Sequence, residues 1–457
     1  MLKTKIEKYF KLKENNTNIQ TELIAGLTTF MTMSYIIIVN PNILSVAGMD
    51  WGAVFTATIL ASVISTLVMS LYAKYPFALA PGMGVNAFFA FTVGLTFGWQ
   101  IALIAVFAEG VIFLIFSLFK VREAIFDVIP KNLKLAIGTG IGLFIAFIGL
   151  VNGGVVVANI PDMPVALGDL SNIGVVLTLA GIVITMSLIC LKVKGSLLLG
   201  ILLTWLLGII CQLTGLYVVN PEIGMYSLIP AGFFSPPPSI AGYNIFSAFE
   251  YVKDGFGIGI FDFIIILFSF LFVDIFETIG TVIGVSEKAG FTDEKGKLPR
   301  IGRILFSDAV GTVVGAGLGT STTTTYAESA AGILAGGKTG LTSFTVAVLF
   351  GLSLFLSPVF SAVPAFATAP ALILVGFMMV QNIVKINFNE PTEGIPAFIT
   401  ILIMPLTYNI AEGIIFGFLS YVILKTVTGK RKEISVTMAI ISIFLIIKLI
   451  VQATTGY

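Results

Sequence analysis

The sequence predicts an all-α polytopic membrane protein of about fourteen transmembrane spans, arranged as two halves of about seven spans each. Two observations carry the membrane prediction. The chain is 57% hydrophobic and 11% charged, whereas soluble domains carry roughly 25% charged residues. Apolar runs of about 20 residues, long enough to cross a ~30 Å hydrocarbon core, recur from Leu23 onward. Lipid offers no hydrogen-bond partners, so these runs are expected to be helices.

Apolar periodicity and helix breakers give the positions of the expected spans. They are 22–47, 52–73, 81–96, 100–119, 135–151, 172–191, 196–214, 260–285, 305–319, 325–336, 341–361, 368–384, 394–409 and 411–427.

The basic loops predict the orientation. Lys and Arg gather in "KVREAIFDVIPKNLK", "KVKG", "EKAGFTDEKGKLPRIGR" and "KTVTGKRKE", which would all lie on one side, whereas "VNGGVVVANIPDMPVALGDLSN" on the other side has no basic residue. By the positive-inside rule the N-terminus is expected in the cytoplasm, with the chain a multi-pass protein of the inner (plasma) membrane. A last apolar run, "ISVTMAIISIFLIIKLIVQ", either crosses the membrane or lies along its surface.

A longer connection, rich in Pro and aromatic residues, separates the two halves at 215–259. Because seven is odd, two repeated halves would be inverted relative to each other in the membrane. Inverted repeats are a recurring transporter architecture, and the site usually forms where the repeats meet. The alternative is that the two halves are not repeats, since any two polytopic segments look weakly alike in sequence.

Two expected spans at equivalent places in the halves are short and rich in helix breakers or small polar residues. The third contains "ALAPGMGVNAFF" and the tenth contains "GLGTSTTTTYAESAAG". Glycine and threonine weaken helices, and non-helical backbone at membrane depth persists only inside protein or beside a wet cavity. We therefore expect a substrate site at Gly84, Val85 and Asn86 from one segment and Thr324 and Thr325 from the other. The alternative is that the threonine hydroxyls bond back to the preceding helical turn.

Intramembrane carboxylates sharpen this prediction. "FLFVDIFETIGTVIGV" places Asp274 and Glu277 on one helix face, and Glu328 follows the threonine run. A charge at mid-helix costs about 2.5 to 3.5 kcal/mol on insertion scales and usually marks a substrate or proton path. Because the chain has no histidine, a coupled proton would be carried by Glu277, Asp274 or Glu328. One of them could instead only pair with a neighbouring Thr or a helix end. No role is assigned to Glu109 or Asp308.

The remaining composition excludes several functions. The net charge of +1 argues against a nucleic-acid partner. The absence of histidine removes most metal and nucleophile sets, so we expect no enzyme, no metal and no cofactor beyond the coupling proton.

The motifs "FVDIFETIGTVIGV", "GKLPRIGR", "GTSTTTTYAESAAGI" and "GMGVNAFFAF" together resemble the AzgA-like purine permeases, a branch of the nucleobase-cation symporters. The resemblance implies substrate-binding carboxylates at Glu277 and Glu328, important polar positions at Asp274 and Asn86, and a homodimer. Members of this branch commonly read "VDxxDT". This chain instead reads "VDIFET", with a glutamate at Glu277 as in the uracil and xanthine branch. The preferred base is therefore open.

The resemblance also implies a division into a core domain and a gate domain. The expected parts are a cytoplasmic tail at 1–20, core at 21–120, gate at 121–214, an extracellular connection at 215–259, core at 260–363, gate at 364–428 and a C-terminal apolar segment at 429–457.

The expected function is import of purine nucleobases (hypoxanthine, guanine or adenine) by proton symport, with the core moving against the gate. The alternatives are a uracil or xanthine permease, or an anion transporter of the same fold. Two glutamates in one pocket would repel an anion and disfavour that last alternative. A channel is a further alternative, which accumulation against a gradient would exclude.

Overall fold

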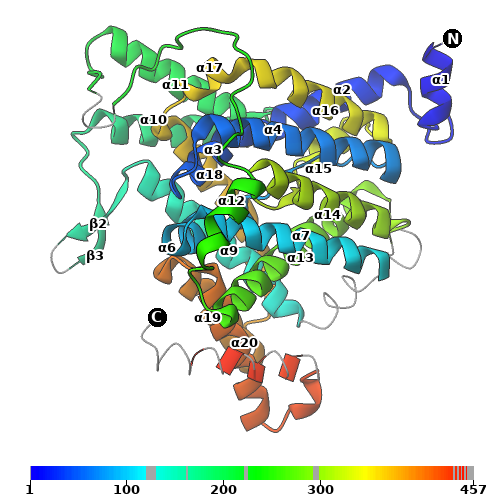
Figure 1. Ribbon diagram of the computed structural model, residues 1–457, viewed down its shortest axis with the longest axis vertical. Coiled ribbons are helices and arrows are strands. Elements are labelled where there is room, and N and C mark those ends of the chain that lie inside the picture. Colours follow the sequence, from blue (N-terminus) through cyan, green and yellow to red (C-terminus); the bar gives the residue numbers. More distant parts are fainter. Residues whose placement is uncertain are drawn as a thin grey trace.

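Helices dominate the computed structural model, which describes residues 2–119, 130–160, 163–220, 225–291 and 298–435, with some positions between 438 and 449 (Figure 1). Ten of the described helices are long and apolar enough to cross a membrane, and two shorter apolar helices span Met83–Phe97 and Pro391–Thr407. Parts of the basic loops, 120–129 and 292–297, lie outside the described residues, as does most of the C-terminal apolar segment. The orientation and the count of fourteen spans stay predictions.

The elements of the first half and the connection follow the expected spans closely. They are α1 (Leu2–Tyr9), α2 (Ile19–Met33), α3 (Ile36–Ser45), α4 (Trp51–Val68), η1 (Met69–Ala73), β1 (Leu79–Pro81), α5 (Met83–Ala87), η2 (Phe88–Gly94), α6 (Leu95–Phe97), α7 (Trp99–Phe119), α9 (Lys131–Asn152), β2 (Val156–Ile160), β3 (Met163–Leu167), α10 (Ile173–Cys190), α11 (Ser196–Leu213), α12 (Ile245–Tyr251) and η4 (Val252–Asp254).

The second half repeats the pattern of long helices around one short strand. Its elements are α13 (Ile260–Ala289), α14 (Ile301–Leu318), β4 (Thr323–Thr325), α15 (Ser329–Leu334), α16 (Gly340–Ser353), η5 (Leu354–Leu356), α17 (Ser357–Ser361), α18 (Ala365–Val380), η6 (Gln381–Lys385), α19 (Pro391–Thr407), α20 (Ile410–Val427) and η7 (Arg431–Glu433).

Polar side chains set the starts of several helices. Asn18, Asp50, Thr339 and Asn409 each accept a hydrogen bond from a backbone amide in the first turn of α2, α4, α16 and α20 respectively. Such caps satisfy amides that have no partner within the helix. Glu22 on α2 is fully buried and accepts from the amides of Thr339 and Thr342. This carboxylate therefore ties α2 to the start of α16.

The long helices pack into two groups, each drawing on both halves of the chain. In one group α14 packs on α4 and α7, α16 packs on α2 and α4, and α13 packs on α7. We call this the strand-bearing group, because β1 and β4 lie within it. In the other, which we call the flanking group, α9 packs on α18 and α19, α19 on α20, and α10 on α11 and α18. Figure 1 shows α4, α14 and α7 running side by side, with α19 and α20 below them.

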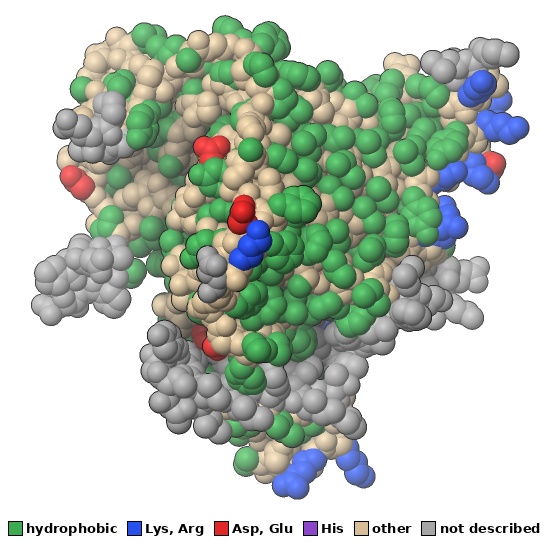
Figure 2. Space-filling model, in the orientation of Figure 1, with side chains coloured by type: hydrophobic (Ala, Val, Ile, Leu, Met, Phe, Trp, Pro, Cys, Tyr) green, Lys and Arg blue, Asp and Glu red, His purple; other side chains and the backbone are tan. Residues whose placement is uncertain are grey.

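The surface of the molecule fits a membrane. On the face in Figure 2 hydrophobic side chains cover the broad middle, while Lys and Arg gather at the edge near the N-terminal helix and at the end near α20. Bundles exposed to lipid carry such an apolar band, with charge confined to its borders.

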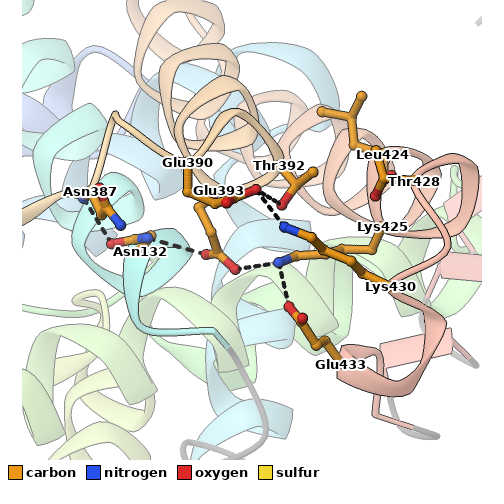
Figure 3. A network of polar contacts seen from close by, with 10 residues as sticks. All are labelled: Asn132, Asn387, Glu390, Thr392, Glu393, Leu424, Lys425, Thr428, Lys430 and Glu433. Carbon is orange, nitrogen blue, oxygen red and sulfur yellow. Dashed lines mark hydrogen bonds and ion pairs between the residues drawn. The ribbon is translucent and has the colours of Figure 1, made fainter.

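A network of charges joins helix ends of the flanking group (Figure 3). The side chain of Lys425 on α20 is 2% exposed and lies 2.8 Å from Glu393 on α19 and 2.5 Å from Glu433 on η7. Asn132 on α9 donates to the same Glu393 carboxylate at 3.2 Å. The network therefore fastens α9, α19 and α20, which come from both halves of the chain, at one end of the group.

An exposed ion pair flanks this network. Lys430 lies 2.8 Å from Glu390, with side chains 38% and 36% exposed. The hydrogen bond from Lys430, together with one from Thr392, holds the pKa of Glu390 at about 2. Because that pKa is below its ordinary value, any stability from the pair is present above about pH 4.5 and is lost as pH falls toward 2.

The buried and exposed lysines give a matched stability test. Lys425→Met should lower the free energy of unfolding by about 3 kcal/mol, because it leaves the Glu393 carboxylate without its cation in a mostly buried position. Lys430→Met should lower the free energy of unfolding much less, because exposed pairs contribute little. Thermal unfolding of the two purified variants in detergent measures the difference, and equal shifts of the melting temperature would contradict it.

Candidate functional site

Two three-residue strands meet in the middle of the strand-bearing group. β1 and β4 pair antiparallel, with Leu79 opposite Thr325, Ala80 opposite Thr324 and Pro81 opposite Thr323. All six residues are buried, and each strand is followed by a short helix, α5 or α15. The tenth expected span is extended at Thr323–Thr325, as the sequence predicts. In the third the extended part is Leu79–Pro81, whereas Gly84–Asn86, expected to be extended, are helical in α5. The strand pairing satisfies backbone groups that lipid would leave unbonded.

The hydroxyl-rich run before β4 is fixed by buried polar side chains from three helices. These partners explain why the run is rich in Thr and Ser, because buried hydroxyl groups need hydrogen-bond partners within the protein. The partners are Asn40 on α3 for Thr320, Asn86 on α5 for Ser321 and Glu109 on α7 for Thr322. The bond between Thr322 and Glu109 is 2.7 Å long. Glu109, to which the sequence assigned no role, thus positions the chain leading into β4.

Glu277 on α13 faces the start of α5. Its Oε1 accepts from the Gly84 amide at 3.5 Å, and the Val85 amide also faces this carboxylate. Its Oε2 has no hydrogen-bond partner among the described residues. A methyl group added at Gly82 would stand 2.8 Å from that Oε2 and 2.7 Å from the Thr324 hydroxyl. Glycine is therefore required for the carboxylate to approach the junction of the two strands.

Glu328 lies three residues after β4, just before α15. Its Oε1 accepts from the Tyr35 hydroxyl at 2.8 Å, and Tyr326 donates to the Pro81 carbonyl at 2.5 Å. Tyr35 is close enough to interact electrostatically with both Glu277 and Glu328. The structure thus brings the two glutamates and two tyrosines around one place.

The intramembrane carboxylates differ in burial. Glu277 and Glu328 are half-buried residues, although the unpartnered Oε2 of Glu277 is itself buried. Asp274, Asp308 and Glu109 are fully buried. The Thr278 hydroxyl lies 2.9 Å from Asp274 and 3.0 Å from Asp308. A hydroxyl has one proton and can donate to only one of them at a time. Asp274 therefore belongs to a buried pair with Asp308, one turn of α13 from Glu277.

The other expected site residues lie around the strand junction. Gly84, Val85 and Asn86 are buried at the start of α5, and the Asn86 side chain contacts Ser321 and the Pro81 carbonyl. A methyl group at Gly84 would meet Ile141 of α9 at 2.8 Å, so this junction borders the flanking group. The hydroxyl of Thr325, which is buried, has no partner in the described structure.

Besides Glu109, sequence reasoning missed two contributors. Tyr35 stands among apolar residues in the first expected span, and no spacing distinguishes it. Asp308 was noticed but was given no role, because its contact with Thr278 joins residues 30 positions apart. Within the described residues no group of three or more Cys, Asp or Glu side chains could hold a metal ion.

Comparison with known proteins places the chain in a family. Residues 20–416 match the xanthine/uracil permease model, described as the Permease family. The chain belongs to this permease family. It is therefore a membrane transporter and not an enzyme. Because 20–416 covers both strands and all the carboxylates discussed, the family match includes the whole candidate site.

The permease is similar to named transporters along nearly its whole length. It is 45% identical to the guanine/hypoxanthine permease PbuO of Bacillus subtilis over 97% of this chain and 100% of that protein. It is 41% identical to the adenine permease AdeP of Escherichia coli, over 97% and 96% of the two chains.

A solved structure supports the fold. The transmembrane domain of the cyanobacterium bicarbonate transporter BicA superposes with a TM-score of 0.62 over 86% of this chain and 96% of that one, at 14% identity. The permease thus has the inverted-repeat fold that its sequence predicts, with one short strand followed by one short helix in each half.

The strand junction offers a steric test. Gly82→Ala should lower the melting temperature markedly, since its methyl group would overlap the Glu277 carboxylate and the Thr324 side chain. Gly138→Ala on α9 is the matched control, because nothing lies within 4 Å of its added methyl group, and alanine favours a helix over glycine by about 1 kcal/mol. Thermal unfolding in detergent compares them, and a Gly82→Ala protein as stable as the control would refute the close approach.

Proposed function

We propose that this permease imports purine nucleobases in symport with protons. The observation that carries the proposal is the Glu277 carboxylate, which faces the Gly84 and Val85 amides with one oxygen left without a partner among the described residues. The names of the similar proteins, a guanine/hypoxanthine permease and an adenine permease, support the same substrate class.

The chemistry of the junction suits a planar base with alternating donors and acceptors along its edges. A carboxylate only accepts, so Glu277 would bind ring or exocyclic N–H groups, while backbone amides and threonine hydroxyls would donate to ring nitrogens and carbonyls. Glu328, held by Tyr35, would complete the opposite side. Gly84, Val85, Asn86, Thr324 and Thr325 would form the floor of the same site.

For coupling we propose that the proton is carried by Glu277, Asp274 and Glu328. The chain has no histidine, so a carboxylate is the available carrier. Asp274 shares the Thr278 hydroxyl with Asp308, and Asp308 also interacts electrostatically with Glu277. A proton that leaves Glu277 thus has buried carboxylates one helical turn away.

For movement we propose that the strand-bearing group is the core domain and the flanking group the gate, with the bounds given by the resemblance. Glu277 and Gly84 border α9 of the flanking group, so displacement of one group along the other would expose the site to alternate sides. We place the N-terminus in the cytoplasm of a plasma-membrane protein, because its basic side chains gather at one border of the apolar surface (Figure 2). A homodimer stays a prediction from the resemblance.

The anion-transport alternative shares the fold, since the BicA domain belongs to a bicarbonate transporter. Two partly accessible carboxylates at the junction disfavour it, because they would repel an anion. The uracil or xanthine alternative differs from the proposed substrates only in the size of the base and in the pattern of donors and acceptors along its edges.

Loss of the Glu277 charge tests binding and coupling. Glu277→Gln should lower the affinity for hypoxanthine about 10- to 100-fold, because hydrogen bonds to a charged group contribute about 1.5 to 3 kcal/mol. Uptake of labelled hypoxanthine should fall with it, and acid-stimulated accumulation should disappear. The exposed Glu250→Gln serves as the control for a neutralised glutamate. Full active uptake by a well-expressed Glu277→Gln protein would move the role to Glu328 or Asp274.

Competition in a permease-deficient cell tests the substrate class. Hypoxanthine, guanine and adenine should each compete for uptake of labelled hypoxanthine, and uracil should compete poorly, because its single ring fills less of the site. N-methylated xanthines should not compete, since a site built to bond an N–H group rejects analogues without it by about 10⁴-fold or more. If uracil or bicarbonate outcompetes every purine base, the purine proposal is wrong.

A further inference from the structure

A cavity of about 520 Å³ lies between the strand-bearing and flanking groups, at the end where α6, the start of α13 and the start of α20 come together. Its volume falls within the roughly 300 to 1,000 Å³ of small-molecule sites. Under the proposed orientation this is the outer end, because α13 begins directly after the extracellular connection. The carboxylates of the candidate site do not line it.

An aromatic pair lies where the cavity wall comes nearest in sequence to the strand junction. Phe88, which lines the cavity, follows Asn86 by two residues and packs edge-to-face on Phe270, with ring centroids 4.7 Å apart. The two rings are 1% and 0% exposed. Ser269, also in the lining, precedes Glu277 by eight residues on α13, or about 12 Å along the helix. The lining therefore comes within a few helical turns of the candidate site without including its carboxylates.

The lining combines apolar faces with a few polar groups. Phe88 and Phe97 contribute aromatic surface, Asp262 and Glu412 contribute carboxylates and Asn409 contributes an amide side chain. Thr92 also lines the cavity, but its hydroxyl oxygen is buried. This is the pattern of small-molecule sites, in which a mostly apolar wall is supplemented by a small number of orienting polar groups.

We propose that this cavity is a docking vestibule, a second binding site for the planar N–H-bearing base, occupied before the base reaches Glu277. The inference rests on the proposed function for the identity of the base. The base stacks on the phenylalanine walls and donates to the Asp262 carboxylate. The Phe88–Phe270 pair is the partition that opens to pass the base inward, and it keeps the vestibule distinct from the strand junction.

The test uses cysteine labelling from outside intact cells. Both native cysteines, Cys190 and Cys211, are free and are first replaced by alanine in a background that retains uptake. Thr96→Cys, in the cavity wall, should react with a membrane-impermeant thiol reagent. Hypoxanthine should slow that reaction several-fold. Leu167→Cys on the β2–β3 hairpin, 65% exposed, is the matched control that should react equally with and without hypoxanthine.

A second background separates the two sites. With Glu277→Gln added, hypoxanthine should still protect Thr96→Cys, because docking in the vestibule does not use Glu277. Protection that disappears with Glu277→Gln would show that only the inner site binds, and would overturn the vestibule. Purine uptake without any protection at Thr96→Cys would overturn it while leaving the proposed function intact.

Failure of the proposed function gives a different result. If no purine enters cells that carry the unaltered protein, the substrate class is wrong whatever the labelling shows. Reaction of Thr96→Cys only with a membrane-permeant reagent would overturn the assignment of the cavity to the outer side, and with it the vestibule.

Discussion

The pairing of β1 with β4 is the constraint on which the site depends. Extended backbone inside an apolar bundle is stable only if its amides and carbonyls find partners, and here each strand supplies them for the other. The Gly82 amide donates to the Thr322 carbonyl at 2.9 Å, just beyond the pair. Because Glu109 fixes the Thr322 hydroxyl, α7 and α13 approach the same junction from different sides. The strands thus create the unwound backbone that a polar ligand can contact, and the helices around them hold it in place.

The intramembrane carboxylates fall into two classes with different consequences. Glu277 and Glu328 are half-buried residues, and Oε2 of Glu277 has no hydrogen-bond partner among the described residues. Asp274 and Asp308 are fully buried, and both lie against the Thr278 hydroxyl. An ionised group is costly inside lipid. Under the proposed function, substrate contact at Glu277 and proton storage at Asp274 would be separated by one turn of α13.

The sequence predicted the long helices well because apolar length and breakers are local signals. The expected span 172–191 is α10 (Ile173–Cys190), and 196–214 is α11 (Ser196–Leu213). It also located both interrupted spans from "PGMGVN" and "TSTTTT", although in the first of them the extended segment is Leu79–Pro81 and "MGVNA" is helical. It could not supply the strand register, because three-residue strands carry no pattern that selects a partner more than 200 residues away. Tyr35 and the Lys425–Glu393 pair were missed for the same reason, since long-range contacts between side chains leave no trace in spacing.

The same inverted-repeat fold carries bicarbonate in the BicA domain, so the fold alone does not choose between an anion and a base. The choice lies in the groups around the strand junction. Backbone amides at Gly84 and Val85 would suit an anion if they stood alone, but here Glu277 already occupies them. With that carboxylate in place, the junction would disfavour an anion and would suit a neutral ligand that brings its own N–H donors. Under the proposed function, Glu277 of α13, which faces the start of α5, is therefore the group that distinguishes a nucleobase site from an anion site on the same fold.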